Sequence, residues 1–502
     1  MALSIAVIPD CPTIDICGEL ATTSAYSLSG HVSVSLQSSF SLFDRRRTAR
    51  LLLQSLVITF EGQSELVTPE TGYSAVRLCS LQQELVRDEP VELNNEGFED
   101  STQPCAWNVV FNLRLPGWLP ASDVFGDRQM APAGTRYALY AIAKYQHIQE
   151  PSQTSPWIST LCAPIMQRTR IAKAPKCNIL LNRFTIPPLV PHSEQSIYPL
   201  GGYIVSTLSQ KSSESGPSIP SDILSKIQIL ASIPEHIGTE QDCAKLTLRL
   251  RAPLLSDEET EKINLSTFTV DIDQREVYHM SLPSYYNRLP IPNEEHQPPR
   301  KALLDPHPMS GLSEVGLLVT PQVCHSSVAR NFSLLAGGST QFEISTANNG
   351  RMFSRRVLPD PNAWYTMQMK LPLVQDSDHP TSESRWAGPC HLRPSSRGPF
   401  LTVKHSLKVT MQCQFDTGDG HIDNLLEFSI PLDFVRERLP LSQQMISQSQ
   451  SLTDVPSSST PSPTMPTSSL YGALPAYSEL YHSNGDRKYD ESVSLPLYTA
   501  SP

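Results

Sequence analysis

The chain has 502 residues, a formal net charge of −11, and 39% hydrophobic and 18% charged residues. This length suffices for two or three domains with real cores, and the acidic balance excludes a general binder of polyanions such as nucleic acid. The 44 prolines are typical of a chain rich in loops, edge strands and disordered segments.

The ten cysteines are scattered and form no C-x-x-C pair, which argues against a zinc knuckle or a redox centre. The N-terminus lacks a basic segment and carries Asp10 and Asp15, so it does not read as a signal peptide. No apolar run approaches the ~20 residues needed to span a bilayer. We therefore expect a cytosolic protein with reduced cysteines, no metal, no cofactor and at most peripheral contact with membranes.

Apolar and polar residues alternate along the first third of the chain, which predicts half-buried strands. The second of these strands runs into Glu61-Gly62, and the third stops at Pro116-Gly117. The apolar positions are Val32, Val34 and Leu36; Leu56, Ile58 and Phe60; Trp107, Val109, Phe111, Leu113 and Leu115; and Tyr137, Leu139, Ala141, Ala143 and Tyr145.

The second half continues the alternation, and no strong amphipathic helix of 15 or more residues interrupts it. Regularly spaced strands of this kind favour antiparallel sandwiches. We expect His405, the one polar inward position of a long strand, to be buried and hydrogen-bonded by a neighbour. Residues 279–312 and 374–399 are predicted to be long loops. The apolar positions are Ile227 and Ile229; Leu246, Leu248 and Leu250; Phe268, Val270 and Ile272; Leu401, Val403, Leu407, Val409, Met411, Cys413 and Phe415; and Leu426, Phe428, Ile430 and Leu432.

Beyond about Leu441 the chain becomes rich in Gln, Ser, Thr and Pro, and such a segment cannot bury enough apolar area to offset its ordering entropy. The motif Leu-Pro-x-Tyr occurs at 282–285, 474–477 and 495–498, and the last two copies lie in this tail. Proline favours the extended polyproline II backbone, and the tyrosine two residues later provides an anchor for an aromatic-lined groove such as that of a WW domain.

Five segments resemble the arrestin fold, and specifically the α-arrestins, a family of trafficking adaptors. The most specific one is a strand followed by Pro-Gly-x-Leu-Pro-x-Ser, at Phe111–Ser122. The resemblance is strong in the first third and thin between residues 180 and 390. The other segments are Ser29–Val34, Leu56–Gly62, Gly134–Ala141 and Pro399–Leu407.

The resemblance implies an all-β protein made of tandem arrestin-like β-sandwiches with a disordered C-terminal tail. The expected divisions are 1–170 for the first sandwich, 171–436 for the second sandwich with long loop inserts, and 437–502 for the tail. Such proteins connect membrane transporters or receptors to HECT-type ubiquitin ligases, whose WW domains bind the tail, and this promotes endocytosis of the cargo. We expect recruitment from the cytoplasm to the plasma membrane or endosomes.

The resemblance assigns ligase binding to the two tail motifs, whose residues are Leu474, Pro475, Tyr477, Leu495, Pro496 and Tyr498. Leu replaces the first proline of the family's Pro-Pro-x-Tyr form in both motifs, so each motif alone should bind weakly. The pair could supply avidity to tandem WW domains. Lys144, Lys173 and Lys176 are candidate modification sites because they lie near the predicted boundary between the sandwiches.

An alternative of a different class is an arrestin-like signalling scaffold that couples a membrane receptor to endosomal machinery without a ligase. Only the ligase adaptor requires the tail tyrosines to bind WW domains, so that binding separates the two hypotheses. An enzyme is the third class, but no G-x-S-x-G, H-E-x-x-H or phosphate-loop motif occurs, and we expect no catalytic residues.

Overall fold

The computed structural model describes residues 2–37, 50–68, 72–87, 89–97, 105–126, 133–148, 169–186, 198–205, 219–316, 327–344, 352–354, 360, 362–377, 386–418 and 420–438. The chain divides into two compact units, Met1–Leu439 and Pro440–Pro502, and every described residue lies in the first. Strands make up 62% of the structure and helices 8%, which confirms the predicted all-β class.

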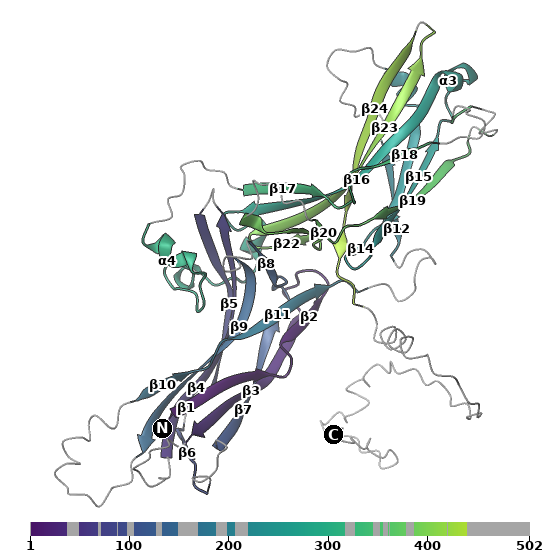
Figure 1. Ribbon diagram of the computed structural model, residues 1–502. Helices are drawn as coiled ribbons and strands as arrows, with labels where there is room; N and C mark the ends of the chain where they lie inside the picture. Colours follow the sequence, from purple (N-terminus) through teal and green to yellow (C-terminus); the bar gives the residue numbers. More distant parts are fainter. Residues whose placement is uncertain are drawn as a thin grey trace, which may run out of the picture. The chain divides into compact units, whose positions relative to one another are not determined.

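The first part of this unit contains two sheets, which we call the first sandwich (Figure 1). The smaller sheet has the order β1-β3-β7. The larger has the order β2-β11-β9-β4-β5, with β6, β8 and β10 paired to its strands. The strands are β1 (Ala2–Pro9), β2 (Thr13–Cys17), β3 (Ala25–Gln37), β4 (Arg50–Thr68), β5 (Gly72–Val86), β6 (Val91–Asn94), β7 (Cys105–Pro116), β8 (Asp123–Phe125), β9 (Ala133–Ile148), β10 (Arg170–Lys173) and β11 (Cys177–Phe184).

The second sandwich pairs a sheet of order β12-β13-β15-β19 with one of order β17-β16-β23-β22, to which β18 and β24 add. Two short ladders, β14-β25 and β20-β21, complete it. The strands are β12 (Leu200–Val205), β13 (Gln228–Pro234), β14 (Ile237–Gly238), β15 (Cys243–Arg251), β16 (Ile263–His279), β17 (Ser327–Ser333), β18 (Thr340–Glu343), β19 (Tyr365–Pro372), β20 (Asp376–Ser377), β21 (Cys390–His391), β22 (Ser396–Arg397), β23 (Leu401–Asp416), β24 (His421–Leu432) and β25 (Phe434–Val435). The helical segments are α2 (Ser221–Leu224), α3 (Asp257–Lys262), α4 (Met309–Glu314), η1 (Ser284–Arg288) and η2 (Glu294–His296).

Each sandwich has its own apolar core. Most of the predicted inward positions are buried, and Trp107, Val109 and Phe428 are half-buried at strand positions near the core. The first core also takes in Tyr278, Phe400 and neighbouring residues at the ends of β16 and β23. The apolar packing of the first sandwich therefore continues into strands whose other ends belong to the second.

Two boundaries differ from the sequence pattern. The strand that includes Leu56 does not end at Glu61-Gly62 but continues to Thr68, and residues 60–66 are all buried. Alternation ends there because both faces of β4 are covered. The larger sheet takes in β10 and β11, so the first sandwich extends past residue 170 to Phe184. The pairing of β11 with β2 joins residues far apart in sequence, so it leaves no local signal.

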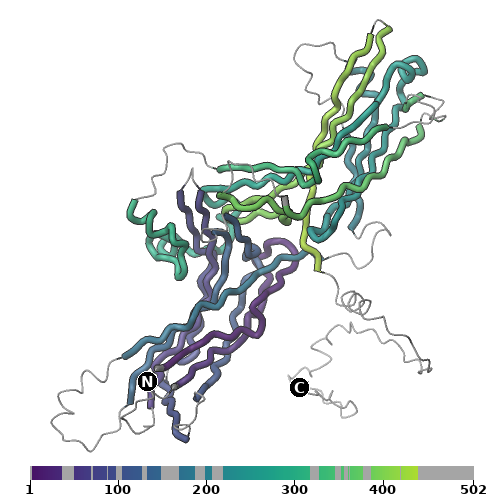
Figure 2. Tube along the Cα trace, in the orientation of Figure 1, coloured from purple at the N-terminus to yellow at the C-terminus, as the bar shows by residue number. Residues whose placement is uncertain are grey.

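The two predicted loops contain short regular elements. Residues 279–312 include η1, η2 and the start of α4, and residues 374–399 include β20, β21 and β22. We call residues 280–316 the strap. It leaves the end of β16 in the second sandwich, and its helix α4 lies beside β5 of the first sandwich (Figures 1 and 2).

Candidate functional site

The six residues predicted to bind the ligase lie outside the described residues, as does the whole of 440–502. Leu474, Pro475 and Tyr477, and likewise Leu495, Pro496 and Tyr498, therefore stay a prediction from sequence. The structure instead describes the point where the tail begins and two networks that join the sandwiches.

The last described residues contact both sandwiches. In the second, β25 runs parallel to β14, and Nε2 of Gln241 donates to Oε1 of Glu437 over 3.1 Å. In the first, the backbone N–H of Thr185 donates to the carbonyl of Arg436 over 3.0 Å. Burial raises the pKa of Glu437 above its usual value. The tail thus begins from a root that is fixed on the body of the protein.

The strap is held chiefly by a buried arginine of the first sandwich, Arg77 on β5. Its side chain is 1% exposed, and its Nε lies 2.8 Å from Oε2 of Glu61, which is equally buried. The terminal nitrogens donate to three strap carbonyls, those of His296, Lys301 and Ala302. A buried guanidinium is tolerated only when its charge and its donors are matched, and the strap provides the acceptors.

A strap glutamine closes the open edge of the larger sheet. The Gln297 side chain accepts from the backbone N–H of Arg77 over 2.7 Å and donates to its carbonyl over 2.8 Å. The amide therefore forms the two hydrogen bonds that a neighbouring strand would form along edge strand β5. Gln297 also donates to the carbonyl of Pro292 within the strap, over 2.9 Å.

Two glutamates of β4 bind the next part of the strap through its backbone. Glu61 accepts from the N–H of Leu304 and Glu65 from the N–H of His307, each over 2.7 Å. Asp305 of the strap accepts from Lys176 over 2.5 Å. Side chains of the first sandwich bind mostly main-chain groups of the strap. This contact therefore depends on the backbone conformation of the strap more than on its side chains.

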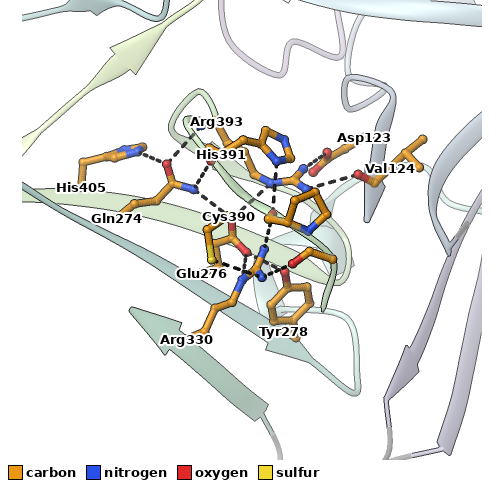
Figure 3. A network of polar contacts seen from close by, with 12 residues as sticks. Asp123, Val124, Gln274, Glu276, Tyr278, Arg330, Cys390, His391, Arg393 and His405 are labelled. Atoms are coloured by element: carbon orange, nitrogen blue, oxygen red, sulfur yellow. Dashed lines mark hydrogen bonds and ion pairs between the residues drawn. The ribbon is translucent and has the colours of Figure 1, made fainter. Parts of the chain in front are cut away.

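A second network centres on Glu276 of β16, which is fully buried (Figure 3). Its carboxylate lies 2.5 Å from Nε of Arg330. It also forms an ion pair with Arg393, whose Nε lies 3.1 Å away but is not hydrogen-bonded to it. Arg393 also pairs with Asp123 of β8 over 2.5 Å. Burial opposes ionisation, but the two guanidinium groups outweigh it and hold the pKa of Glu276 below its usual value.

His405 is buried and satisfied, as the sequence predicts. Its Nε2 lies 3.0 Å from Oε1 of Gln274, and its Nδ1 lies 2.9 Å from Oγ of Ser395. The amide oxygen only accepts, so Nε2 carries the proton, and the Ser395 hydroxyl donates to Nδ1. This arrangement fits the neutral imidazole, and burial lowers the pKa of His405 to about 3.

The first Leu-Pro-x-Tyr copy is part of the strap. Leu282 packs against the core of the first sandwich. The Tyr285 hydroxyl donates to the carbonyl of Arg397 and lies 3.2 Å from that of Gly398. The neighbouring Tyr286 is fully buried and donates to the same Arg397 carbonyl over 3.2 Å. This copy therefore has a structural role in the folded protein.

Sequence reasoning missed the residues of both networks. The signal available was charge inside strands: Arg77 lies in an otherwise apolar run, and Glu276 follows an alternating strand. The candidate modification sites Lys144, Lys173 and Lys176 are all exposed, and Lys176 also pairs with Asp305. Within the described ranges, no group of three or more His, Cys, Asp or Glu side chains is placed to hold a metal ion.

The described part of the chain contains no helix that is long and apolar enough to cross a membrane. Comparison with known proteins adds no family assignment: no protein-family model matches the chain, and a search of curated proteins finds no match.

Proposed function

We propose that this protein is an arrestin-like adaptor that links membrane transporters or receptors to a WW-domain HECT ubiquitin ligase and promotes ubiquitin-dependent endocytosis. The body binds cargo, and the tail binds the ligase. The adaptor works from the cytoplasm and is recruited to the plasma membrane or endosomes.

The observation that carries the proposal is the pair of Leu-Pro-x-Tyr motifs in a tail that follows an all-β body. The motif prolines are 21 residues apart, at 475 and 496. The Ser/Thr/Pro-rich composition predicts a flexible chain, which at this length would span about 25 Å, from roughly 5–6 Å times the square root of its residue number. The two motifs are therefore able to occupy adjacent WW domains, and each weak contact raises the local concentration for the other.

The tail root adds a second support. Its hydrogen bonds to both sandwiches fix where the tail begins, so a ligase bound through the tail stays near the body and near any cargo bound there. A linker of this kind brings two partners together without a direct contact between them.

A pull-down with isolated WW domains of a HECT ligase tests the proposal. The variant with both Tyr477→Ala and Tyr498→Ala should lose binding. A matched control carries Tyr481→Ala and Tyr489→Ala, which are tail tyrosines without a preceding Leu-Pro, and should bind like the wild type. Retained binding by the first variant would sink the ligase-adaptor function and favour a scaffold.

A further inference from the structure

The strap contains a complete third copy of the tail motif, Leu282-Pro283-Ser284-Tyr285. Pro283 has φ −58° and ψ 147°, which is the polyproline II region. The proline is thus already in the conformation that extended-peptide grooves accept, whereas Ser284 and Tyr285 begin the 3-10 helix η1 and must unwind to follow it.

In the folded protein, the side chains of this motif already make contacts with other residues. Leu282 packs on the first core, and Tyr285 hydrogen-bonds the turn between β22 and β23 through the carbonyls of Arg397 and Gly398. The ring of Tyr285 lies 4.5 Å from that of the fully buried Tyr286, measured between centroids. A WW groove needs the tyrosine ring and hydroxyl, so it cannot take Tyr285 while this packing persists.

Access to the motif is coupled to the rest of the strap. The bond from Gln297 to the carbonyl of Pro292 connects the η1 region to the segment that encloses Arg77. Leu282, Leu289 and Ile291, which flank η1, pack on the first core. When the strap leaves the first sandwich this support is lost, and Tyr285 is held only by its hydrogen bonds to Arg397 and Gly398, which a WW groove or water can replace.

We propose that Leu282–Tyr285 is a latent third ligase-binding motif, withheld in the closed protein and presented to a WW domain when the strap detaches from the first sandwich. This rests on the proposed function, because it assumes that the Leu-Pro-x-Tyr motif binds WW domains. The motif would then add a ligase contact only in molecules whose two sandwiches have come apart at the strap.

Titration calorimetry with one isolated WW domain gives the first comparison. The synthetic peptide 279–291 should bind, as should the tail peptide 471–481. Full-length protein carrying Tyr477→Ala and Tyr498→Ala should bind at least about 30-fold more weakly than peptide 279–291, because apparent affinity falls with the fraction of molecules in the competent state.

Opening the strap in that full-length background gives the second comparison. Gln297→Ala removes the two edge hydrogen bonds, and Arg77→Met removes the buried cation; each should bring binding toward that of the peptide. Adding Tyr285→Ala should abolish the gain. Glu294→Ala, on a strap side chain that is 91% exposed, is the matched control and should change nothing. Circular dichroism and hydrogen exchange over residues 294–308 establish that each variant is folded and open.

The outcomes separate the two proposals. If peptide 471–481 binds and peptide 279–291 does not, the latent motif is wrong and the adaptor function stands. If neither peptide binds, both fail. Equal binding by peptide 279–291 and the closed full-length variant overturns the inference, as does a folded, open Gln297→Ala variant without any gain in binding.

Discussion

Replacing Arg77 by Met should loosen the strap more than any other single change. Methionine keeps much of the apolar stem that packs under the strap and removes the charge and its donors. Glu61, whose side chain is 2% exposed, is then a buried carboxylate without its cation. Breaking a buried ion pair by removing one partner typically costs about 3–5 kcal/mol.

Two contacts reduce this cost. The N–H of Leu304 still donates to Glu61 over 2.7 Å, and the exposed backbone around Lys301 and Ala302 exchanges the lost bonds for water. We therefore expect the lower end, about 3 kcal/mol, which corresponds to roughly 100-fold in the opening equilibrium of the strap. The Arg77→Met, Glu61→Gln double variant should lose less than the sum of the single variants, since no unpaired charge remains.

Hydrogen exchange is the appropriate assay, because a body of two sandwiches need not unfold in one step. The amides of Leu304 and His307, which donate to Glu61 and Glu65, should exchange about 100-fold faster in Arg77→Met. The amide of Ala231, in the core of the second sandwich, is the internal control. An increase of less than about threefold at the two strap amides would refute the assignment of Arg77 as the main anchor.

Three further predictions concern acid, backbone strain and avidity. The pKa of His405 falls from 6.5 to about 3 on folding. As the pH is lowered, the unfolded state therefore binds a proton before the folded state does. Acid should remove up to about 1.4 kcal/mol of stability per pH unit between pH 6.5 and pH 3. Denaturant titrations at pH 7 and pH 5 should show this slope, and His405→Gln should reduce it. A Cβ at Gly388 would lie 2.4 Å from a backbone oxygen, whereas Gly418, also at positive φ, has open space. Gly388→Ala should therefore lower the unfolding temperature well beyond Gly418→Ala, which costs only about 1–2 kcal/mol of strain; equal shifts would contradict the packing of that turn. In the tail, Tyr477→Ala or Tyr498→Ala alone should weaken tandem-WW binding about 100-fold in calorimetry, and a loss of less than threefold would mean that the motifs act independently.

The strands were predictable because their signal is local. Inward and outward positions alternate within each strand, and this identified the buried faces of β3, β4, β9 and β23 from residue type alone. The alternation also placed His405 inside, where only a hydrogen-bonded neutral histidine fits. The end of β4 was not predictable, because Glu61 and Glu65 face outward in the pattern but are buried by partners distant in sequence, which include the strap amides of Leu304 and His307.

The two networks could not be found in the sequence for a related reason. Arg77 and the carbonyls it binds are separated by more than 200 residues. Every residue has a main-chain carbonyl, so the residue types do not show which ones bind Arg77. Glu276 and Asp123 likewise meet through Arg393, which comes from a predicted loop. The tail motifs, in contrast, were found from the sequence alone, because they lie outside the described residues.

Recruitment of a ubiquitin ligase by the two tail motifs is tested by mass spectrometry of ubiquitin remnants on full-length protein recovered from cells that express it. We expect remnants on lysines of the wild type and of the Tyr481→Ala, Tyr489→Ala control, and their loss when Tyr477 and Tyr498 are both replaced by Ala. Equal remnants with and without the two motif tyrosines, or no remnants on any form, would contradict it.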